Sequence, residues 1–349
     1  MRVIDDIKDW KEKAIVATIG FFDGVHSGHR FLIEEMRRVA LERNIPAAVI
    51  TFPVHPRMVL QSDYQPRLLN SYEERLHRLS ETGIDYVIVM NFTPSMAMLT
   101  AREFIVEILS AQWGVKILFV GYDHRFGHLR SEGFEQYVVY GKECGMEVLD
   151  AGAYSKDGVT FSSSVIRQLL RSGDVSGAAR VLGYFYRLKG HVVNGYRIGR
   201  SIGFPTANIA VDENFKVLPA AGSYAVWVVV DGRKFAGGSF EAEPLEVCRG
   251  GSDPRRSSQL AGKRFKGMLY IGSRPTVHDN GDMSIEVNIF DFSEDIYDEA
   301  VTVEFVEFIR GDMKFDSLDE LTAQMHFDKQ KADELLEKQK FGTENYFMR

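Results

Sequence analysis

The chain has 349 residues, of which 45% are hydrophobic and 26% are charged, and its formal net charge is −7. This length indicates about two domains, and the composition excludes a disordered, collagenous or coiled-coil protein. Neither half of the chain is basic, so no nucleic-acid partner is expected.

The N-terminal segment Met1–Trp10 carries three aspartates and no apolar core, so it is not expected to be a signal peptide. No apolar run approaches the roughly 18 residues of a membrane helix, so no membrane association is expected. The two cysteines, Cys144 and Cys248, exclude a disulfide scaffold and fit a reducing compartment. These features together predict a cytoplasmic protein.

Short apolar runs alternate with helical patterns through the first half of the chain. A helix is expected from about Gly28 to Arg43, and the capping box Thr100-Ala-Arg-Glu103 begins another that continues to about Ala111. A third helix is expected from Ser131. This alternation predicts a Rossmann-like α/β domain, a parallel sheet with helices on both faces and ligands at the carboxyl ends of its strands. The expected strands are Ala14–Ile19, Ala47–Thr51, Tyr86–Met90, Lys116–Val120 and Met146–Leu149.

The segment Gly20-Phe-Phe-Asp-Gly-Val-His-Ser-Gly-His29 lies between the first strand and the first helix. The N–H groups and dipole of the helix favour phosphate there, and His26 and His29 can donate hydrogen bonds to phosphate oxygens. An incidental glycine-rich turn is the less favoured alternative, and zinc is poorer still because no other His or Cys cluster completes a site. The expected ATP- and phosphate-binding residues of this segment are Gly20, Phe21, Asp23, Gly24 and Gly28.

Three further motifs follow in the first half: Thr51-Phe-Pro-Val-His-Pro56, Gly121-Tyr-Asp-His-Arg-Phe-Gly127 and Ser162-Ser-Ser-Val-Ile-Arg167. In the last motif a serine can cap a helix, while the hydroxyls and Arg167, one turn in, can bind nucleotide phosphates. By itself, that segment is more safely a plain helix cap with a surface arginine. His55 is given equal weight as a turn residue and as a substrate contact.

After about Gly183, glycines punctuate short β-rich runs, which predict a small antiparallel β-barrel. A second capping box, Ser317-Leu-Asp-Glu320, begins a terminal helix that continues to about Lys340. The domains are therefore expected to span residues 1–185 and 186–349. The expected barrel strands include Tyr224–Val230, Met268–Ile271, Ser284–Phe290 and Val301–Phe308.

The most specific stretch of the second half ends in Pro205-Thr-Ala-Asn208. Thr206 and Asn208 offer a hydroxyl and an amide oxygen, both of which suit Mg²⁺ bound with ATP. The glycines before them predict a backbone arch over a nucleotide, with a series of glycine-rich turns as the alternative. The nucleotide-binding residues expected in this arch are Gly195, Gly199, Arg200 and Gly203.

The motifs of the first half resemble the nucleotidylyltransferase superfamily, and their order resembles the FMN adenylyltransferase domain of bacterial bifunctional riboflavin kinase/FAD synthetases. The resemblance implies that FMN attacks the α-phosphate of ATP and releases pyrophosphate. That family usually has Thr where Ser164 stands and often a basic residue where Val165 stands, so Val165 is given no phosphate role. The roles implied are catalysis for His26, His29 and Arg167, phosphate binding for Ser162, Ser163 and Ser164, and a flavin or nucleotide contact for Asp123.

The second half resembles the riboflavin kinase signature, in which Thr206 and Asn208 would hold Mg²⁺ with ATP. The resemblance also implies a catalytic glutamate on a later strand, and Glu286 is the matching base for the ribityl hydroxyl. A matching segment near the terminal helix places Arg310, Lys314 and Phe315 on the flavin side. The family lacks roughly residues 238–263, and this insertion is expected to be an exposed and dispensable excursion.

We therefore expect a cytoplasmic enzyme that makes FMN in its second domain and FAD in its first, using MgATP for both. The expected partners are the small molecules riboflavin, FMN, FAD and ATP. Two rivals are a single-activity adenylyltransferase with a non-catalytic barrel and a flavin-binding regulatory protein. Retention of Thr206, Asn208 and Glu286 argues against the first rival.

Overall fold

The computed structural model describes residues 1–61, 63–121, 125–127, 132–152, 155–156, 159–195, 199, 203–230, 248–249, 263–273 and 283–340. Contacts within the chain divide it into two units. The first runs from Met1 to Ser162 and includes strand β12, and the second begins at Ser163 and includes the terminal helix. None of the described helices is long and apolar enough to cross a membrane.

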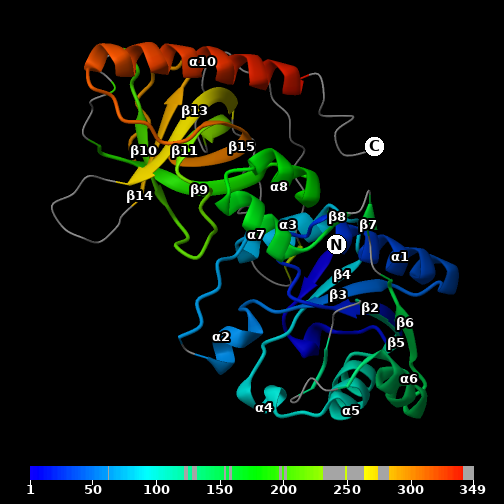
Figure 1. Ribbon diagram of the computed structural model, residues 1–349. Helices are drawn as coiled ribbons and strands as arrows, with labels where there is room; N and C mark the ends of the chain where they lie inside the picture. Colours follow the sequence, from blue (N-terminus) through cyan, green and yellow to red (C-terminus); the bar gives the residue numbers. More distant parts are fainter. Residues whose placement is uncertain are drawn as a thin grey trace. The chain divides into compact units, whose positions relative to one another are not determined.

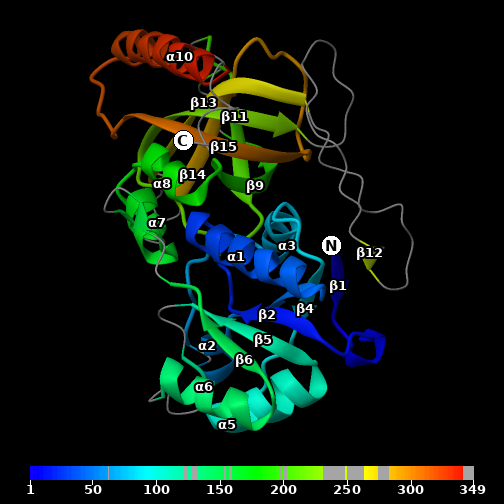
Figure 2. The same cartoon turned by 90° about the vertical axis from the view of Figure 1, so that its right-hand side faces the viewer.

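In the described part of the first unit, seven strands form one parallel sheet in the order β12-β1-β4-β3-β2-β5-β6 (Figures 1 and 2). The parallel sheet predicted from the sequence is confirmed. Its bounds are β1 (Arg2–Ile4), β2 (Ile15–Ile19), β3 (Ala47–Thr51), β4 (Tyr86–Val89), β5 (Val115–Val120), β6 (Glu147–Asp150) and β12 (Cys248–Arg249).

Helices cover both faces of this sheet. Successive residues of a strand point to opposite faces, and apolar residues of these strands are buried on both faces. Val16 of β2 belongs to a buried cluster with Met36, whereas its neighbour Ala17 belongs to a second cluster with Ile105 and Tyr137. In Figure 2, α1 and α3 lie on one side of the strands and α5 and α6 on the other. The bounds are α1 (Ser27–Arg43), α2 (Pro56–Leu60), α3 (Tyr72–Ser80), α4 (Pro94–Ala97), α5 (Ala101–Glu103) and α6 (Phe134–Glu143), with the short strands β7 (Ser155–Lys156) and β8 (Val159–Thr160) after them.

Two helices of the first unit differ in detail from the sequence prediction. The capping box at Thr100 is present, since its Oγ1 accepts from the Glu103 N–H at 3.2 Å and its N–H donates to Glu103 at 2.8 Å. The chain then continues as a π-helix over Phe104–Gln112 rather than as an α-helix. The helix expected from Ser131 begins at Phe134, with Gly133 at its N-cap.

Six antiparallel strands of the second unit, counted over the residues with a described position, close into the predicted barrel. Their order around the barrel is β10-β14-β13-β11-β15-β9, and β9 pairs with β10 to complete the ring. The bounds are β9 (Tyr186–Val193), β10 (Ala207–Val211), β11 (Gly222–Val230), β13 (Lys263–Ser273), β14 (Met283–Ile289) and β15 (Ala300–Arg310).

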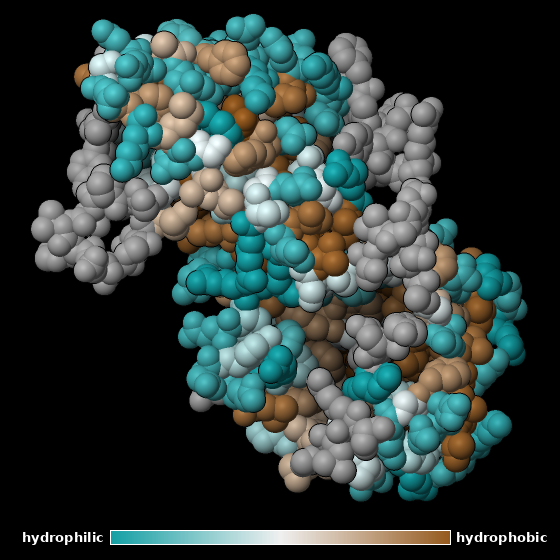
Figure 3. Space-filling view, viewed as in Figure 1, coloured by the Kyte–Doolittle hydropathy of each residue, from teal (hydrophilic) through white to brown (hydrophobic). Residues whose placement is uncertain are grey.

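The terminal helix α10 (Leu318–Lys340) lies across the barrel, as Figures 1 and 2 both show. Its Ala332 and Leu336 are fully buried and share a cluster with Trp227 of β11 and Val306 of β15. Apolar burial of this kind is what holds an amphipathic helix to a sheet. The side chains over the outside of α10 are mostly hydrophilic (Figure 3).

Helices α7 (Ser163–Arg171) and α8 (Val175–Leu182) belong to the second unit by their contacts. The Ser176 hydroxyl of α8 donates to Glu307 of β15 at 3.0 Å, which ties this helix to the barrel. The predicted boundary between residues 185 and 186 would instead group both helices with the first domain. That boundary stays a prediction, because the contacts define structural units and not catalytic domains.

The predicted insertion at about 238–263 falls almost entirely outside the described residues. Its Cys248–Arg249 form β12, which pairs in parallel with β1 at the edge of the first sheet. These two residues therefore belong to the first unit rather than extending an exposed hairpin of the barrel.

Candidate active sites

The loop between β2 and α1 has a backbone conformation that most side chains avoid. Phe22, Gly24 and Val25 have φ angles of 56°, 87° and 37°, in the left-handed region that is most unusual for a β-branched residue. Phe22 and Val25 are nevertheless buried, and the Val25 N–H donates to the Phe22 carbonyl at 3.1 Å. Packing therefore holds a strained loop in the shape that presents His26 at the start of α1.

His26 and His29 lie face to face at this helix start. Their ring centroids are 3.7 Å apart and their planes differ by 21°. His26 is the N-cap residue, yet within the described part of the chain its side chain does not cap the N–H groups of α1. Gly28 allows the close packing, since a Cβ there would lie 3.2 Å from the His26 ring and 3.3 Å from the Phe161 carbonyl oxygen. The structure thus brings the two predicted histidines together.

Burial, and then the neighbouring His26, lower the pKa of His29 well below its ordinary value of 6.5. His29 is therefore a neutral imidazole at neutral pH, and it can donate one hydrogen bond without carrying a charge. In the unfolded chain the same side chain would take up a proton near pH 6.5. Folding stability is consequently unaffected by His29 above that pH and falls as the pH drops below it.

Asp23 is buried in the interior of the first unit. Its carboxylate is buried and accepts hydrogen bonds from the N–H groups of Leu69 at 3.0 Å and Asn70 at 3.1 Å. These bonds attach the β2–α1 loop to the segment that enters α3. The carboxylate thereby fixes the loop, while the phosphate-binding role expected for Asp23 stays a prediction.

Arg75 of α3 is a buried cation that the sequence motifs do not reveal. It is 1% exposed, and its guanidinium lies 3.9 Å from the centre of the Phe21 ring. One Nη donates to the Phe52 carbonyl at 2.5 Å, while Nε is buried and has no hydrogen-bond partner among the described residues. Burial lowers the pKa of Arg75 to about 10, with Asp23 opposing that change, so the side chain stays charged. Arg75 therefore links the loops that follow β2 and β3.

Replacing Arg75 with Met should lower kcat/KM by at least about tenfold for the FAD formation that the sequence resemblance implies. The change removes the cation under Phe21 and leaves Asp23 without its nearby positive charge, and such uncompensated burial typically costs about 1–3 kcal/mol. Steady-state kinetics with added FMN measure the effect, and riboflavin phosphorylation by the same preparation serves as the control. Arg75→Lys keeps the charge and should recover part of the activity. Equal rates in all three proteins would contradict a positioning role.

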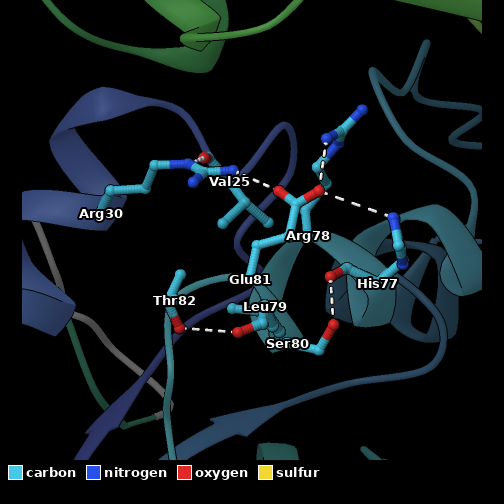
Figure 4. Close-up of polar contacts among 8 residues, drawn as sticks. All are labelled: Val25, Arg30, His77, Arg78, Leu79, Ser80, Glu81 and Thr82. Carbon is cyan, nitrogen blue, oxygen red and sulfur yellow. Dashed lines mark hydrogen bonds and ion pairs between the residues drawn. The ribbon is translucent and has the colours of Figure 1, made fainter. Parts of the chain in front are cut away.

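An ion cluster joins α1 to the end of α3 beside the strained loop (Figure 4). Arg30 donates to the Val25 carbonyl at 3.3 Å and to Glu81 at 2.7 Å, and Arg78 reaches the same carboxylate at 2.7 Å. Burial opposes ionisation of Glu81, but Arg78 and Arg30 outweigh it and lower the pKa of this carboxyl. The cluster therefore stays ionised and helps to hold Val25 in place.

The serine triplet is divided between the two units. Ser162 ends the first unit, directly after the Phe161 carbonyl that faces Gly28. Ser163 and Ser164 are the first two residues of α7, and Arg167 lies one turn further along that helix. The triplet therefore begins a helix as predicted, while the phosphate roles of these residues stay predictions.

His55 caps α2, because its Nδ1 accepts from the Arg57 N–H at 3.2 Å. This bond supports the turn role that the sequence left open. The His55 ring also meets the Phe21 ring edge-on at 4.8 Å between centroids. Asp123 and Arg200, two of the predicted ligand contacts, lie outside the described residues.

In the second unit, Glu286 of β14 and Asn208 of β10 lie directly opposite each other. The Glu286 carboxylate accepts from Thr206 Oγ1 at 3.2 Å and from the Ser284 hydroxyl at 3.0 Å. The structure thus gathers the three predicted kinase residues, and it adds Ser284, which no sequence motif marked. Two hydroxyl donors leave further lone pairs of the carboxylate for a substrate hydroxyl.

The oxygen donors around Glu286 fit a hard divalent cation. A hydroxyl, an amide oxygen and a carboxylate are the donors that Mg²⁺ prefers. Gly195 lies close against this group, since a Cβ there would overlap the side-chain amide of Asn208. At Gly199, a Cβ would lie 3.4 Å from Thr206 Oγ1, and the Phe204 N–H donates to the Gly199 carbonyl at 2.8 Å. Gly203 has a φ of 81°, which explains a glycine in this turn.

Arg310 makes hydrogen bonds within the second unit that hold its side chain against α10. Its Nε donates to Asp328 of α10 at 2.8 Å, and its Nη1 to the Gly311 carbonyl at 3.0 Å. The side chain is 17% exposed and that of Asp328 3%. Of the three residues expected on the flavin side, this leaves the exposed Lys314 and the half-buried Phe315 as the better contacts.

A strained loop with paired histidines after the first long strand of a parallel sheet, and a Thr–Asn–Glu cluster on a closed barrel, define a two-domain nucleotide-dependent transferase. Comparison with known proteins agrees. A family model for FAD synthetase matches residues 8–165, and one for riboflavin kinase matches residues 182–336. The chain belongs to the family of bifunctional riboflavin kinase/FMN adenylyltransferases, as the sequence resemblance indicated.

Similar proteins of that name cover nearly the whole chain. The Escherichia coli K12 protein is 34% identical over 98% of this chain and 97% of its own length, and the Bacillus subtilis 168 protein is 32% identical over 93% of each. A crystal structure described as a macrolide-efflux protein from Streptococcus pneumoniae superimposes with a TM-score of 0.77. It is 29% identical and covers 95% of this chain and 98% of its own.

Proposed function

We propose that the chain makes FAD from riboflavin in two steps, with the residues below in each role. The barrel transfers the γ-phosphate of ATP to riboflavin, giving FMN and ADP. The α/β domain joins FMN to the AMP part of a second ATP, giving FAD and pyrophosphate. The observation that carries this proposal is that both the His26–His29 pair and the Thr206–Glu286 cluster are assembled on one chain.

In the kinase reaction, Glu286 accepts the proton of the ribityl 5′-hydroxyl as that oxygen attacks the γ-phosphate. Its hydrogen bonds to Thr206 and Ser284 fix the direction of the carboxylate. Thr206 and Asn208 are the residues that would hold Mg²⁺. When bound, Mg²⁺ neutralises charge on the ATP phosphates.

In the adenylylation, a phosphate oxygen of FMN is itself the nucleophile at the α-phosphate of ATP, and pyrophosphate leaves. No covalent enzyme intermediate is needed, so the task of the protein is to position two anions that repel each other. His26 and the neutral imidazole of His29 donate hydrogen bonds to the phosphate oxygens on which charge develops. Arg167, Ser163 and Ser164 are proposed as further phosphate contacts.

One assay tests the function as a whole. Pure protein is incubated with riboflavin and MgATP, and the products are separated by chromatography. Formation of both FMN and FAD supports the proposal. Formation of FAD only from added FMN would indicate a single-activity adenylyltransferase, and bound flavin without any product would indicate a regulatory protein.

Two cysteines in 349 residues support a reducing compartment, and we place the protein in the cytoplasm.

Replacing Thr206 with Val should raise the Mg²⁺ concentration for half-maximal kinase activity by at least about tenfold, because the variant loses one oxygen ligand at unchanged size. FAD formation from added FMN should keep its Mg²⁺ dependence. Titration of both activities with Mg²⁺ makes the measurement, and Thr206→Ser, which retains the hydroxyl, is the matched control. An unchanged Mg²⁺ requirement in Thr206→Val would show that this hydroxyl is not a ligand.

A further inference from the structure

Tyr270 lies beside the proposed catalytic base without having been marked by any sequence motif. It stands on β13 directly opposite Glu286 of β14. Residues directly opposite in an antiparallel pair project from the same face of the sheet. The Tyr270 side chain therefore projects from the same face as the carboxylate of Glu286. The ring lies over Gly272, where a Cβ would overlap the tyrosine hydroxyl.

The Tyr270 hydroxyl donates to the Asp312 carboxylate at 2.7 Å. Asp312 belongs to the segment Arg310–Phe315 between β15 and α10, and the same Oδ1 also accepts the Met313 N–H at 3.0 Å. Burial, then the bond to Asp312, raises the pKa of Tyr270 to about 12. The hydroxyl therefore remains a hydrogen-bond donor at any pH at which the enzyme would work.

The same segment is held at its start by a different contact. Arg310 pairs with the buried Asp328 of α10, so the first residue of the segment is fixed to that helix. Beyond Arg310, Gly311, Asp312, Met313 and Lys314 are all exposed. The bond from Tyr270 to Asp312 therefore fixes an exposed stretch of chain to the strand next to Glu286.

We propose that Tyr270 is a positioning residue of the kinase site, holding the Arg310–Phe315 segment, through Asp312, where Lys314 and Phe315 can contact riboflavin. The inference rests on the proposed kinase function and deepens it. Tyr270 takes no part in the proton transfer. Its effect is on the affinity for the flavin, because it orders one wall of the flavin pocket before the substrate binds.

Tyr270→Phe removes only the hydroxyl and so tests this proposal directly. We expect the KM for riboflavin to rise about tenfold, the value expected from losing one hydrogen bond to a charged acceptor. The KM for ATP and kcat should change little, and FAD formation from added FMN should be that of the wild type. Asp312→Ala, on the exposed side of the same bond, should have the same effect, and the double variant should be no worse than either single one.

The matched control is Tyr224→Phe. The Tyr224 hydroxyl donates to the Ala220 carbonyl at 2.6 Å, away from Glu286, so this variant also loses one tyrosine hydrogen bond within the same unit. It should lower the thermal midpoint of unfolding without changing the ratio of the KM for riboflavin to the KM for ATP. An unchanged riboflavin KM in Tyr270→Phe and Asp312→Ala, additive effects in the double variant, or a fall in kcat alone would overturn the proposal. Absence of FMN formation by the wild type would instead refute the kinase function itself.

Discussion

Replacing both His26 and His29 with Ala should abolish FAD formation from added FMN while riboflavin is still phosphorylated. Both imidazoles lie at the start of α1, directly after a strained loop that packing holds in one shape. Loss of a single transition-state hydrogen-bond donor typically costs about 2.7–4 kcal/mol, so two losses should leave a rate near the limit of detection. The kinase residues lie in the other unit and are unchanged.

The measurement is the rate of FAD and pyrophosphate formation with FMN and MgATP, with FMN formation from riboflavin measured in parallel. His77→Ala is the matched control, since this residue of α3 lies in the same unit and faces Glu81 at 3.5 Å. The control should keep both activities. Near wild-type FAD formation by the double variant would refute the assignment of the two histidines.

The neutral state of His29 gives this site a defined pH behaviour. Because its pKa lies well below 6.5, the imidazole does not titrate above neutral pH, and FAD formation should show no loss from this residue between pH 7 and pH 9. The thermal midpoint of unfolding should fall as the pH drops below 6.5, and it should fall less in His29→Asn, which has no ionisable group. Equal slopes in the two proteins would show that His29 is not buried in the neutral form.

The architecture could be predicted because it depends on local patterns. The expected Ala47–Thr51 strand is β3 at the same bounds, and the glycine-rich β-runs after Gly183 form the expected barrel. A run of buried apolar residues between turn signals is visible in the sequence whatever it packs against. β1 is missed because a strand of three residues is too short to show a period.

The interior of the adenylyltransferase site could not be predicted in the same way. Asp23 and Arg75 are charged, and a charged residue in a sequence is read as a surface or ligand-binding group. Their burial follows from contacts between segments about 50 residues apart, the loop after β2 and the start of α3. Only the capping box from Ser71 to Glu74 marks that helix start in the sequence, and it does not show which side of the helix is buried.

The residues of the kinase cluster could be predicted, but only from the family resemblance and not from a local pattern. Thr206 and Glu286 are 80 residues apart and meet only because β10 and β14 pair in the barrel. Alternation in Ser284–Phe290 predicts a strand but gives no reason to choose its glutamate. The resemblance to riboflavin kinases supplied that choice, and the register of the two strands now explains it physically.

Replacing Glu286 with Gln should stop FMN formation, while FMN supplied to the same protein is still converted to FAD. Glutamine has the size of glutamate, and its oxygen can still accept from Thr206 or Ser284. It cannot take the proton of the ribityl hydroxyl, and loss of a general base typically removes about 10²–10⁴ in rate. The fall should appear in kcat, because the residue acts in the chemical step.

Two further variants distinguish loss of the general base from the effect of changing any glutamate on a barrel strand. Glu286→Asp keeps a carboxylate one methylene shorter, so its kinase rate should lie between those of the wild type and Glu286→Gln. Glu307→Gln changes a strand glutamate of the same barrel that accepts from Ser176 of α8, and it should leave kinase turnover intact. Single-turnover FMN formation with saturating MgATP makes the measurement. Wild-type turnover in Glu286→Gln would mean that this carboxylate is a structural acceptor for Thr206 and Ser284, and that the base of the kinase lies elsewhere.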